Sequence, residues 1–169
     1  MKELLKRKMN LSFFLIALGC STNGTESESQ IRDEIQHQLD RCVLAVATKD
    51  IELYMSLIPE DFVIYDQSGE IISREVQKEY TIRDWSIIDR TLSNQYIADS
   101  ITINGDSAIV FTSQRWERLM FQRDGKTIDT ILTTQNHIES WKKTKNGWMN
   151  YEVKELGGDI FINGKEYRN

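Results

Sequence analysis

Residues 96–112 read YIADSITINGDSAIVFT, in which two strand-like stretches flank an Asn-Gly-Asp turn. Asn-Gly between two such stretches is a strong hairpin signal, because both residues tolerate the positive φ angles of a tight turn. The pattern recurs at Asp124-Gly125 and at Asn146-Gly147. These turns separate four predicted strands, at residues 88–104, 107–122, 127–143 and 148–156. The C-terminal half is therefore predicted to form an antiparallel meander of long strands.

Amphipathic helices are predicted before this meander. Apolar residues recur at spacings of three and four in a first helix, with Ser29 as its N-cap. Asp50 is expected to cap a short second helix that Pro59 stops, and a third helix is expected from Ser73 to about Trp85. The stripe of the first helix consists of Ile31, Ile35, Leu39, Cys42, Val43 and Val46. Helices followed by an antiparallel meander indicate an α+β fold.

The composition describes a small acidic globular protein. The chain has 169 residues and a formal net charge of −5, and 40% of its residues are hydrophobic. This balance excludes collagen-like, disordered and disulfide-rich chains. The acidic charge offers no electrostatic basis for binding nucleic acid.

The N-terminus combines a basic start with a short apolar run. Four basic residues lie within the first eight, and residues 11–18 (LSFFLIAL) follow. This run is shorter than the roughly 20 apolar residues that span a membrane, and it has the length of a secretory signal. It ends in Ala17-Leu18-Gly19-Cys20, which resembles the lipobox of bacterial lipoproteins, although Leu is usual where Ala17 stands. A plain signal peptide with an incidental cysteine is the alternative.

The lipobox resemblance implies a domain organisation and a location. Residues 1–19 would be a signal peptide that is removed, and Cys20 would carry the lipid. Residues 20–29 contain many polar side chains, which is typical of a flexible tether, and residues 30–169 would form the folded domain. We expect an exported protein that is anchored in the bacterial cell envelope, facing either the periplasm or the outside.

Several segments together resemble the nuclear transport factor 2-like superfamily, in particular its SnoaL-like and ketosteroid isomerase-like branches. The segments are residues 47–50 (ATKD), 59–62 (PEDF), 104–108 (NGDSA), 139–142 (ESWK) and 146–148 (NGW). The resemblance implies a cone-shaped α+β barrel, with three N-terminal helices packed in a curved antiparallel sheet. It also implies a cavity for a small, largely apolar molecule, which some members of the superfamily transform.

The resemblance to ketosteroid isomerases assigns candidate catalytic positions. Asp66 falls at the position of the proton-shuttling base, Cys42 at that of an oxyanion-binding Tyr, and Asn136 at that of a protonated acid. Cys is only a weak donor and Asn is not an acid, so efficient steroid-type isomerisation is not expected. Alternatively, Asp66 only bonds the backbone of the Gln-Ser-Gly turn that follows it.

Strand alternation under the same alignment predicts the cavity lining. The inward-facing residues are expected to be Val110, Thr112, Gln114 and Trp116 on one strand and Leu132, Thr134, Asn136 and Ile138 on the next. The predicted ligand pocket consists of Tyr80, Thr112, Gln114, Trp116, Thr134 and Asn136. The alternative is that these side chains only fill a closed cone. The predicted outer face carries Phe111, Ile131, His137 and Trp141, which favours a homodimer formed through the sheet.

Three classes of function stay open at this point. The first and favoured one is a lipid-anchored module that binds a small apolar molecule, and the second is an isomerase or cyclase that uses Asp66. The third is a non-catalytic dimerisation or interaction module. No cofactor is expected, and the two histidines lack the clustered partners of a metal site.

Overall fold

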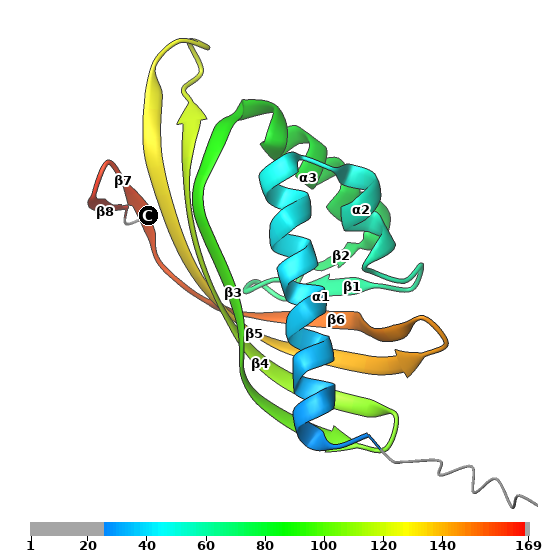
Figure 1. The fold of residues 1–169 in the computed structure, drawn as a ribbon. Coiled ribbons are helices and arrows are strands. Elements are labelled where there is room, and N and C mark those ends of the chain that lie inside the picture. Colours follow the sequence, from blue (N-terminus) through cyan, green and yellow to red (C-terminus); the bar gives the residue numbers. More distant parts are fainter. Residues whose placement is uncertain (1–25, 168–169) are drawn as a thin grey trace, which may run out of the picture.

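The computed structural model describes residues 26–167 (Figure 1), so the predicted signal peptide and Cys20 lie outside the described residues. The elements are α1 (Glu28–Thr48), α2 (Ile51–Ser56), β1 (Val63–Tyr65), β2 (Ile71–Ser73), α3 (Arg74–Ile87), β3 (Ile88–Asn104), β4 (Ser107–Phe121), β5 (Ile128–Thr144), β6 (Gly147–Gly157), β7 (Ile160–Ile162) and β8 (Lys165–Tyr167). Within residues 26–167, no helix is both long and apolar enough to cross a membrane.

Helix α1 begins two residues earlier than predicted. Its N-cap is Ser27, whose hydroxyl accepts from the backbone N–H of Gln30, while the Gln30 side chain accepts from the N–H of Ser27 at 2.8 Å. This reciprocal capping box needs an acceptor three residues after the cap. The predicted cap, Ser29, is followed at that spacing by Arg32, which has no acceptor. The prediction of Ser29 was therefore wrong.

The predicted starts of the other two helices are confirmed. Asp50 caps α2 by accepting from the N–H of Leu53 at 2.9 Å, and Ser73 caps α3 by accepting from the N–H of Val76 at 3.4 Å. Helix α2 ends at Ser56, before Pro59. These caps satisfy backbone donors that would otherwise lack partners, which fixes where each helix begins.

The four long predicted strands are confirmed as β3 to β6. The main path of the sheet runs in the order β2-β1-β6-β5-β4-β3, and β7 pairs with β5. The sheet is not purely antiparallel as expected, because β1 pairs with β6 in parallel. The strands β2, β7 and β8 have three residues each, which is too short to show an alternating pattern in the sequence.

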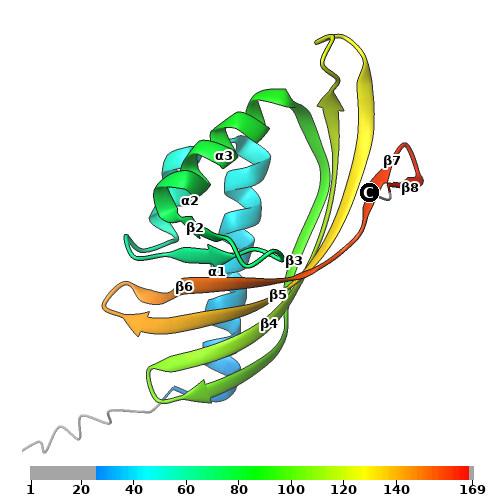
Figure 2. The same cartoon turned by 180° about the vertical axis from the view of Figure 1, so that it is seen from behind.

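The sheet curves around the helices, and Figures 1 and 2 show all three helices against its concave face. Register shifts along β3, for example between Ala98 and Ser100, mark bulges of the kind that bend a strand. The result is the expected cone-shaped α+β fold.

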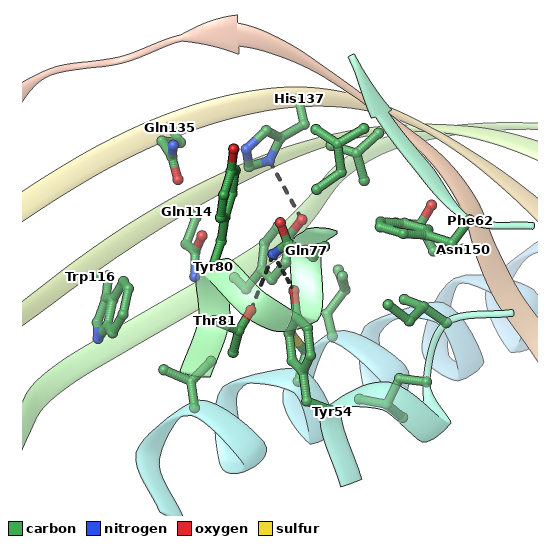
Figure 3. Close-up of a pocket in the computed structure, with 18 of the residues that line it drawn as sticks. Tyr54, Phe62, Gln77, Tyr80, Thr81, Gln114, Trp116, Gln135, His137 and Asn150 are labelled. Carbon is green, nitrogen blue, oxygen red and sulfur yellow. Dashed lines mark hydrogen bonds between the residues drawn. The ribbon is translucent and has the colours of Figure 1, made fainter. Parts of the chain in front are cut away.

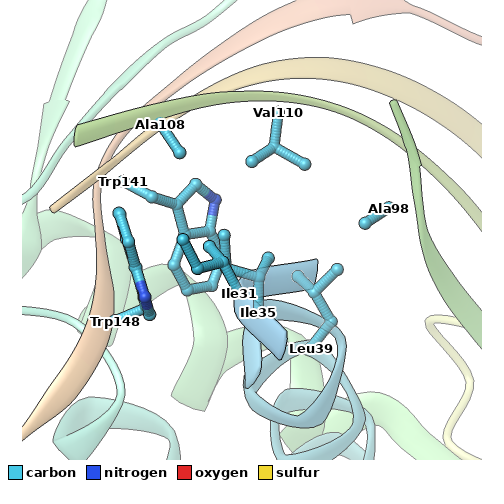
Figure 4. Close-up of a cluster of buried hydrophobic side chains, with 8 residues drawn as sticks. All are labelled: Ile31, Ile35, Leu39, Ala98, Ala108, Val110, Trp141 and Trp148. Carbon is cyan, nitrogen blue, oxygen red and sulfur yellow. The ribbon is translucent and has the colours of Figure 1, made fainter. Parts of the chain in front are cut away.

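A cluster of buried side chains packs α1 against strands β3 to β6 (Figure 4). Ala98 and Ala108 are small, and they leave space on the sheet for the larger helix side chains. Trp141 belongs to this cluster and is only 3% exposed, so its predicted position on the outer face was wrong. The cluster consists of Ile31, Ile35, Leu39, Ala98, Ala108, Val110, Trp141 and Trp148.

Candidate functional site

An open cavity of about 390 Å³ lies between the helices and the concave face of the sheet. Its walls come from α1, α2 and α3 on one side and from β3 to β6 on the other (Figure 3). A volume of this size is within the range of pockets that enclose small organic ligands. The cone is therefore not filled by its own side chains.

The helical side of the cavity is mainly apolar and aromatic. Tyr54 of α2 and Trp85 of α3 pack edge to face, with ring centroids 5.9 Å apart. The Tyr54 hydroxyl accepts from the Gln77 side chain at 3.0 Å, and burial raises the pKa of this phenol. Aliphatic and aromatic neighbours extend this wall, and they are Leu39, Val46, Leu57, Ile58, Phe62, Ile64 and Ile72.

The sheet side presents mainly uncharged polar groups to the cavity, and Arg118 of β4 and Glu155 of β6 are its charged members. Gln114, Gln135 and His137 project from β4 and β5 (Figure 3). Gln114 donates to the side-chain oxygen of Asn94 at 3.0 Å, which holds its amide in place. A lining of apolar walls with a few fixed polar groups orients a ligand without requiring it to be charged.

Trp116 lies toward one end of the cavity (Figure 3) and is fixed by its neighbours. Its indole N–H donates to the Thr91 hydroxyl at 3.2 Å, and the Arg118 guanidinium stacks 4.0 Å from its ring centroid. Arg118 also donates to the Thr133 hydroxyl at 3.1 Å, and burial lowers its pKa to about 10. Tyr80 of α3 lines the same cavity and is 36% exposed.

A fully buried carboxylate, Glu139 of β5, lies behind the cavity wall. The hydroxyls of Tyr96 and Thr112 both donate to its Oε1 atom, the latter at 2.8 Å. The indole N–H of Trp141 and the side-chain N–H of Asn150 donate to its Oε2 atom, at 2.8 and 2.7 Å. Burial raises the pKa of Glu139, while hydrogen bonds from its neighbours oppose that rise. Its four lone-pair positions are thus all used.

His137 connects this network to the cavity. Its Nδ1 atom lies 3.3 Å from the Thr112 hydroxyl and 3.5 Å from the Tyr96 hydroxyl. The ring is only 5% exposed, and burial lowers its pKa to about 4. His137 is therefore a neutral imidazole in the cavity wall at physiological pH. It does not lie on the outer face as the sequence prediction had placed it.

The structure brings only part of the predicted pocket together. Tyr80, Gln114 and Trp116 line the cavity, and Thr112 lies just behind it in the Glu139 network. Thr134 and Asn136 instead border a separate shallow hollow with Ile97 and Ser113, so their predicted place in the cavity was wrong. The side chains that β5 turns to the cavity are one residue out of step with the prediction, and they are Thr133, Gln135, His137 and Trp141.

Pairing between β4 and β5 explains this error. Thr112 pairs with His137 and Trp116 with Thr133, whereas Asn136 pairs with Ser113. Directly paired residues lie on the same face of a sheet, so a one-residue error reverses the whole strand. The signal was present in the sequence, because a hairpin centred on Asp124-Gly125 places residue 112 opposite residue 137.

Asp66 is not part of the cavity lining. Its carboxylate accepts from the Ser68 hydroxyl at 2.7 Å and from the N–H of Glu70 at 2.8 Å, within the turn that joins β1 to β2. The hydrogen bond from Ser68 is the largest cause that lowers its pKa. A carboxylate stabilised in this way is a poor proton acceptor, so the geometry agrees with the turn-bonding alternative.

Cys42 lines the cavity from α1 as a free thiol. Burial raises its pKa to about 12, and the charge on Glu139 adds to that rise. A thiol with such a pKa stays protonated and unreactive. It does not replace the strong oxyanion donor of an isomerase.

Comparison with known proteins shows the fold. No protein-family model and no curated protein matches this sequence. A nuclear transport factor 2-like superfamily protein from Salmonella enterica is 18% identical, with a TM-score of 0.60 over 78% of this chain and 93% of that one. A nuclear transport factor 2-like protein from Cytophaga hutchinsonii is 17% identical, with a TM-score of 0.57 over 73% and 95%. A conserved protein from Planctomyces limnophilus is 13% identical, with a TM-score of 0.65 over 79% of this chain and 98% of that one.

The similarities to these solved structures and the cone geometry indicate the same fold. The chain has the nuclear transport factor 2-like fold, as the sequence resemblance implied. This fold commonly encloses a small-ligand site, but the fold alone does not determine the chemistry.

Proposed function

We propose that this protein binds a small, largely apolar and uncharged molecule in its cone. The observation that supports this most is the open cavity of about 390 Å³, with aromatic and aliphatic walls and a few fixed amides. The isomerase alternative needed Asp66 within the cavity, and the turn uses that carboxylate instead. Binding without transformation therefore fits the site best.

The proposal includes attachment to the bacterial cell envelope. It rests on the basic start, the short apolar run and the lipobox-like residues 17–20. Lipidation of Cys20 after removal of residues 1–19 would tether the ligand-binding domain at a membrane surface.

Trp116→Ala is expected to weaken ligand binding about tenfold, because it removes a large apolar surface from the cavity wall. The measurement is a fluorescence titration of the full chain with N-phenyl-1-naphthylamine, an uncharged apolar probe. Leu44→Ala is the matched control, since Leu44 is 53% exposed and lies outside the cavity. Equal affinities of the wild type and the Trp116 variant would contradict a site in the cone.

We also propose a homodimer formed through the convex face of the sheet. Ile97, Ile109 and Phe111 alternate with the inward-facing residues and are 46%, 43% and 46% exposed. Apolar side chains grouped in this way favour an interface. Light scattering of the wild type at micromolar concentration is expected to give the mass of two chains. The Phe111→Arg variant is expected to give the mass of one chain. Leu44→Arg, which adds the same charge on α1, should leave the dimer intact. A monomeric wild type would refute the dimer.

A further inference from the structure

Hydrogen bonding determines which nitrogen of His137 carries the proton. The hydroxyls of Tyr96 and Thr112 each have one proton, and both donate it to Oε1 of Glu139. Each hydroxyl oxygen can then only accept from a further neighbour. Because Nδ1 of His137 faces these two oxygens, the imidazole proton lies on Nδ1 and is donated toward Thr112, the nearer one.

The other oxygen of Glu139 cannot reverse this arrangement. The groups facing Oε2, from Trp141 and Asn150, are N–H donors. The orientation of the Asn150 amide is fixed in turn, because its oxygen accepts from the backbone N–H of Glu152 at 3.1 Å. Oε2 must therefore be an acceptor, and the hydroxyl protons remain directed at Oε1.

With the proton on Nδ1, the Nε2 atom of His137 presents a lone pair. Nε2 has no hydrogen-bond partner within residues 26–167, and it is not among the side-chain atoms sealed from solvent. The ring itself lines the cavity (Figure 3). We propose that the cavity recognises an aromatic molecule through a phenol-type hydroxyl that donates to Nε2 of His137. This inference rests on the proposed binding function and names its ligand class.

The charges next to His137 favour a neutral hydroxyl over a carboxylic acid. Arg118, a cation of the cavity lining, stacks on Trp116 and donates to Thr133 instead. Glu139 lies behind the imidazole, and Glu155 of β6 pairs with His137 across the sheet and also lines the cavity. A ligand carboxylate next to these two groups would be repelled. A phenol supplies a strong donor without adding a charge, and its ring fits the aromatic wall.

The first test compares 2-naphthol with 2-methoxynaphthalene, which has the same rings but no hydroxyl proton. We expect the wild-type full chain to bind 2-naphthol about tenfold more tightly, because the ether leaves Nε2 unpaired and places two acceptors together. Equal affinities would overturn the inference while leaving the proposed function intact. Binding of neither probe would overturn both.

Glu139→Gln tests the role of the buried carboxylate, which acts on the ligand only through His137. The carbonyl of the new amide must face Trp141 and Asn150, so its NH₂ group faces the hydroxyls of Tyr96 and Thr112. Those hydroxyls must then donate to Nδ1, which moves the imidazole proton to Nε2. We expect the tenfold preference for 2-naphthol to disappear in this variant. A preference that persists would contradict the positioning role.

Nitrogen-15 NMR of the imidazoles reads the tautomer directly and needs no ligand. The chain has two histidines, and the other, His37, is exposed on α1 and serves as the internal control in a preparation without a histidine tag. The wild type is expected to show His137 with its proton on Nδ1. A proton on Nε2 in the wild type would overturn the inference, even if the Glu139 variant failed to fold.

Acidification should mimic the amide substitution. Burial places the pKa of Glu139 above its ordinary value and that of His137 near 4, so falling pH protonates Glu139 first. At pH values between these two pKa values, Glu139 is protonated and His137 is still neutral, and the imidazole proton is expected on Nε2. The other titratable groups here are Tyr96 of β3, Cys42 of α1 and Tyr54 of α2, which burial keeps neutral, and Glu155, Asp84 and Arg118 in the cavity lining. Repeating the pH series on Glu139→Gln is the control, because this variant should show no change of tautomer.

Discussion

Replacement of Glu139 by leucine is expected to lower the free energy of unfolding by about 3 kcal/mol or more, with a melting temperature roughly 10 °C lower. The physical reason is that Trp141 and Asn150 would keep buried N–H groups without an acceptor, since they are only 3% and 8% exposed. Each such group costs about 1–3 kcal/mol. Thermal and urea unfolding of the full chain measure the effect.

Glu139→Gln is the matched control for this prediction. Its carbonyl still accepts from both N–H groups, and it removes a buried charge that has no cationic partner in the described part of the chain. We therefore expect the glutamine variant to be at least as stable as the wild type at neutral pH, where the charge is costly to bury. If the leucine variant were equally stable, the polar network would not stabilise the fold.

Cys20→Ala is expected to abolish lipid labelling and to move the protein completely from the membrane to the soluble fraction. Each buried methylene of an acyl chain contributes about 0.8 kcal/mol, so two chains anchor stably where one is marginal. Labelling with radioactive palmitate and fractionation by centrifugation measure both effects.

The second cysteine provides the control for this experiment. Cys42 is a half-buried free thiol in the cavity wall, so Cys42→Ala should leave labelling and fractionation unchanged. A Cys20 variant that stays with the membrane would exclude lipidation as the anchor. Loss of labelling in both variants would instead indicate a defect in folding or export.

Local chemistry in the sequence determined most of the fold. Asp50 and Ser73 begin helices where predicted, because a cap needs only a side-chain acceptor and the N–H groups that follow it. The turns at Asn104-Gly105 and Asp124-Gly125 end strands where predicted, because their glycines adopt positive φ. The cone shape was predicted from the resemblance of several short segments, taken in their order along the chain, to one family. Signals of this kind act within a few residues.

The functional site depended on tertiary structure. A one-residue difference in strand parity moved Asn136 out of the cavity and His137 into it, since alternate residues of a strand face opposite sides. The resemblance placed Asp66 at the position of a base, but in the fold its carboxylate accepts from the backbone of the turn that follows it. Glu139 belongs to one of the family-like segments, but nothing in the sequence indicated its buried network, because its four donors come from three other strands and its own. Local patterns place backbone, whereas only the packed sheet decides which polar groups meet in the absence of water.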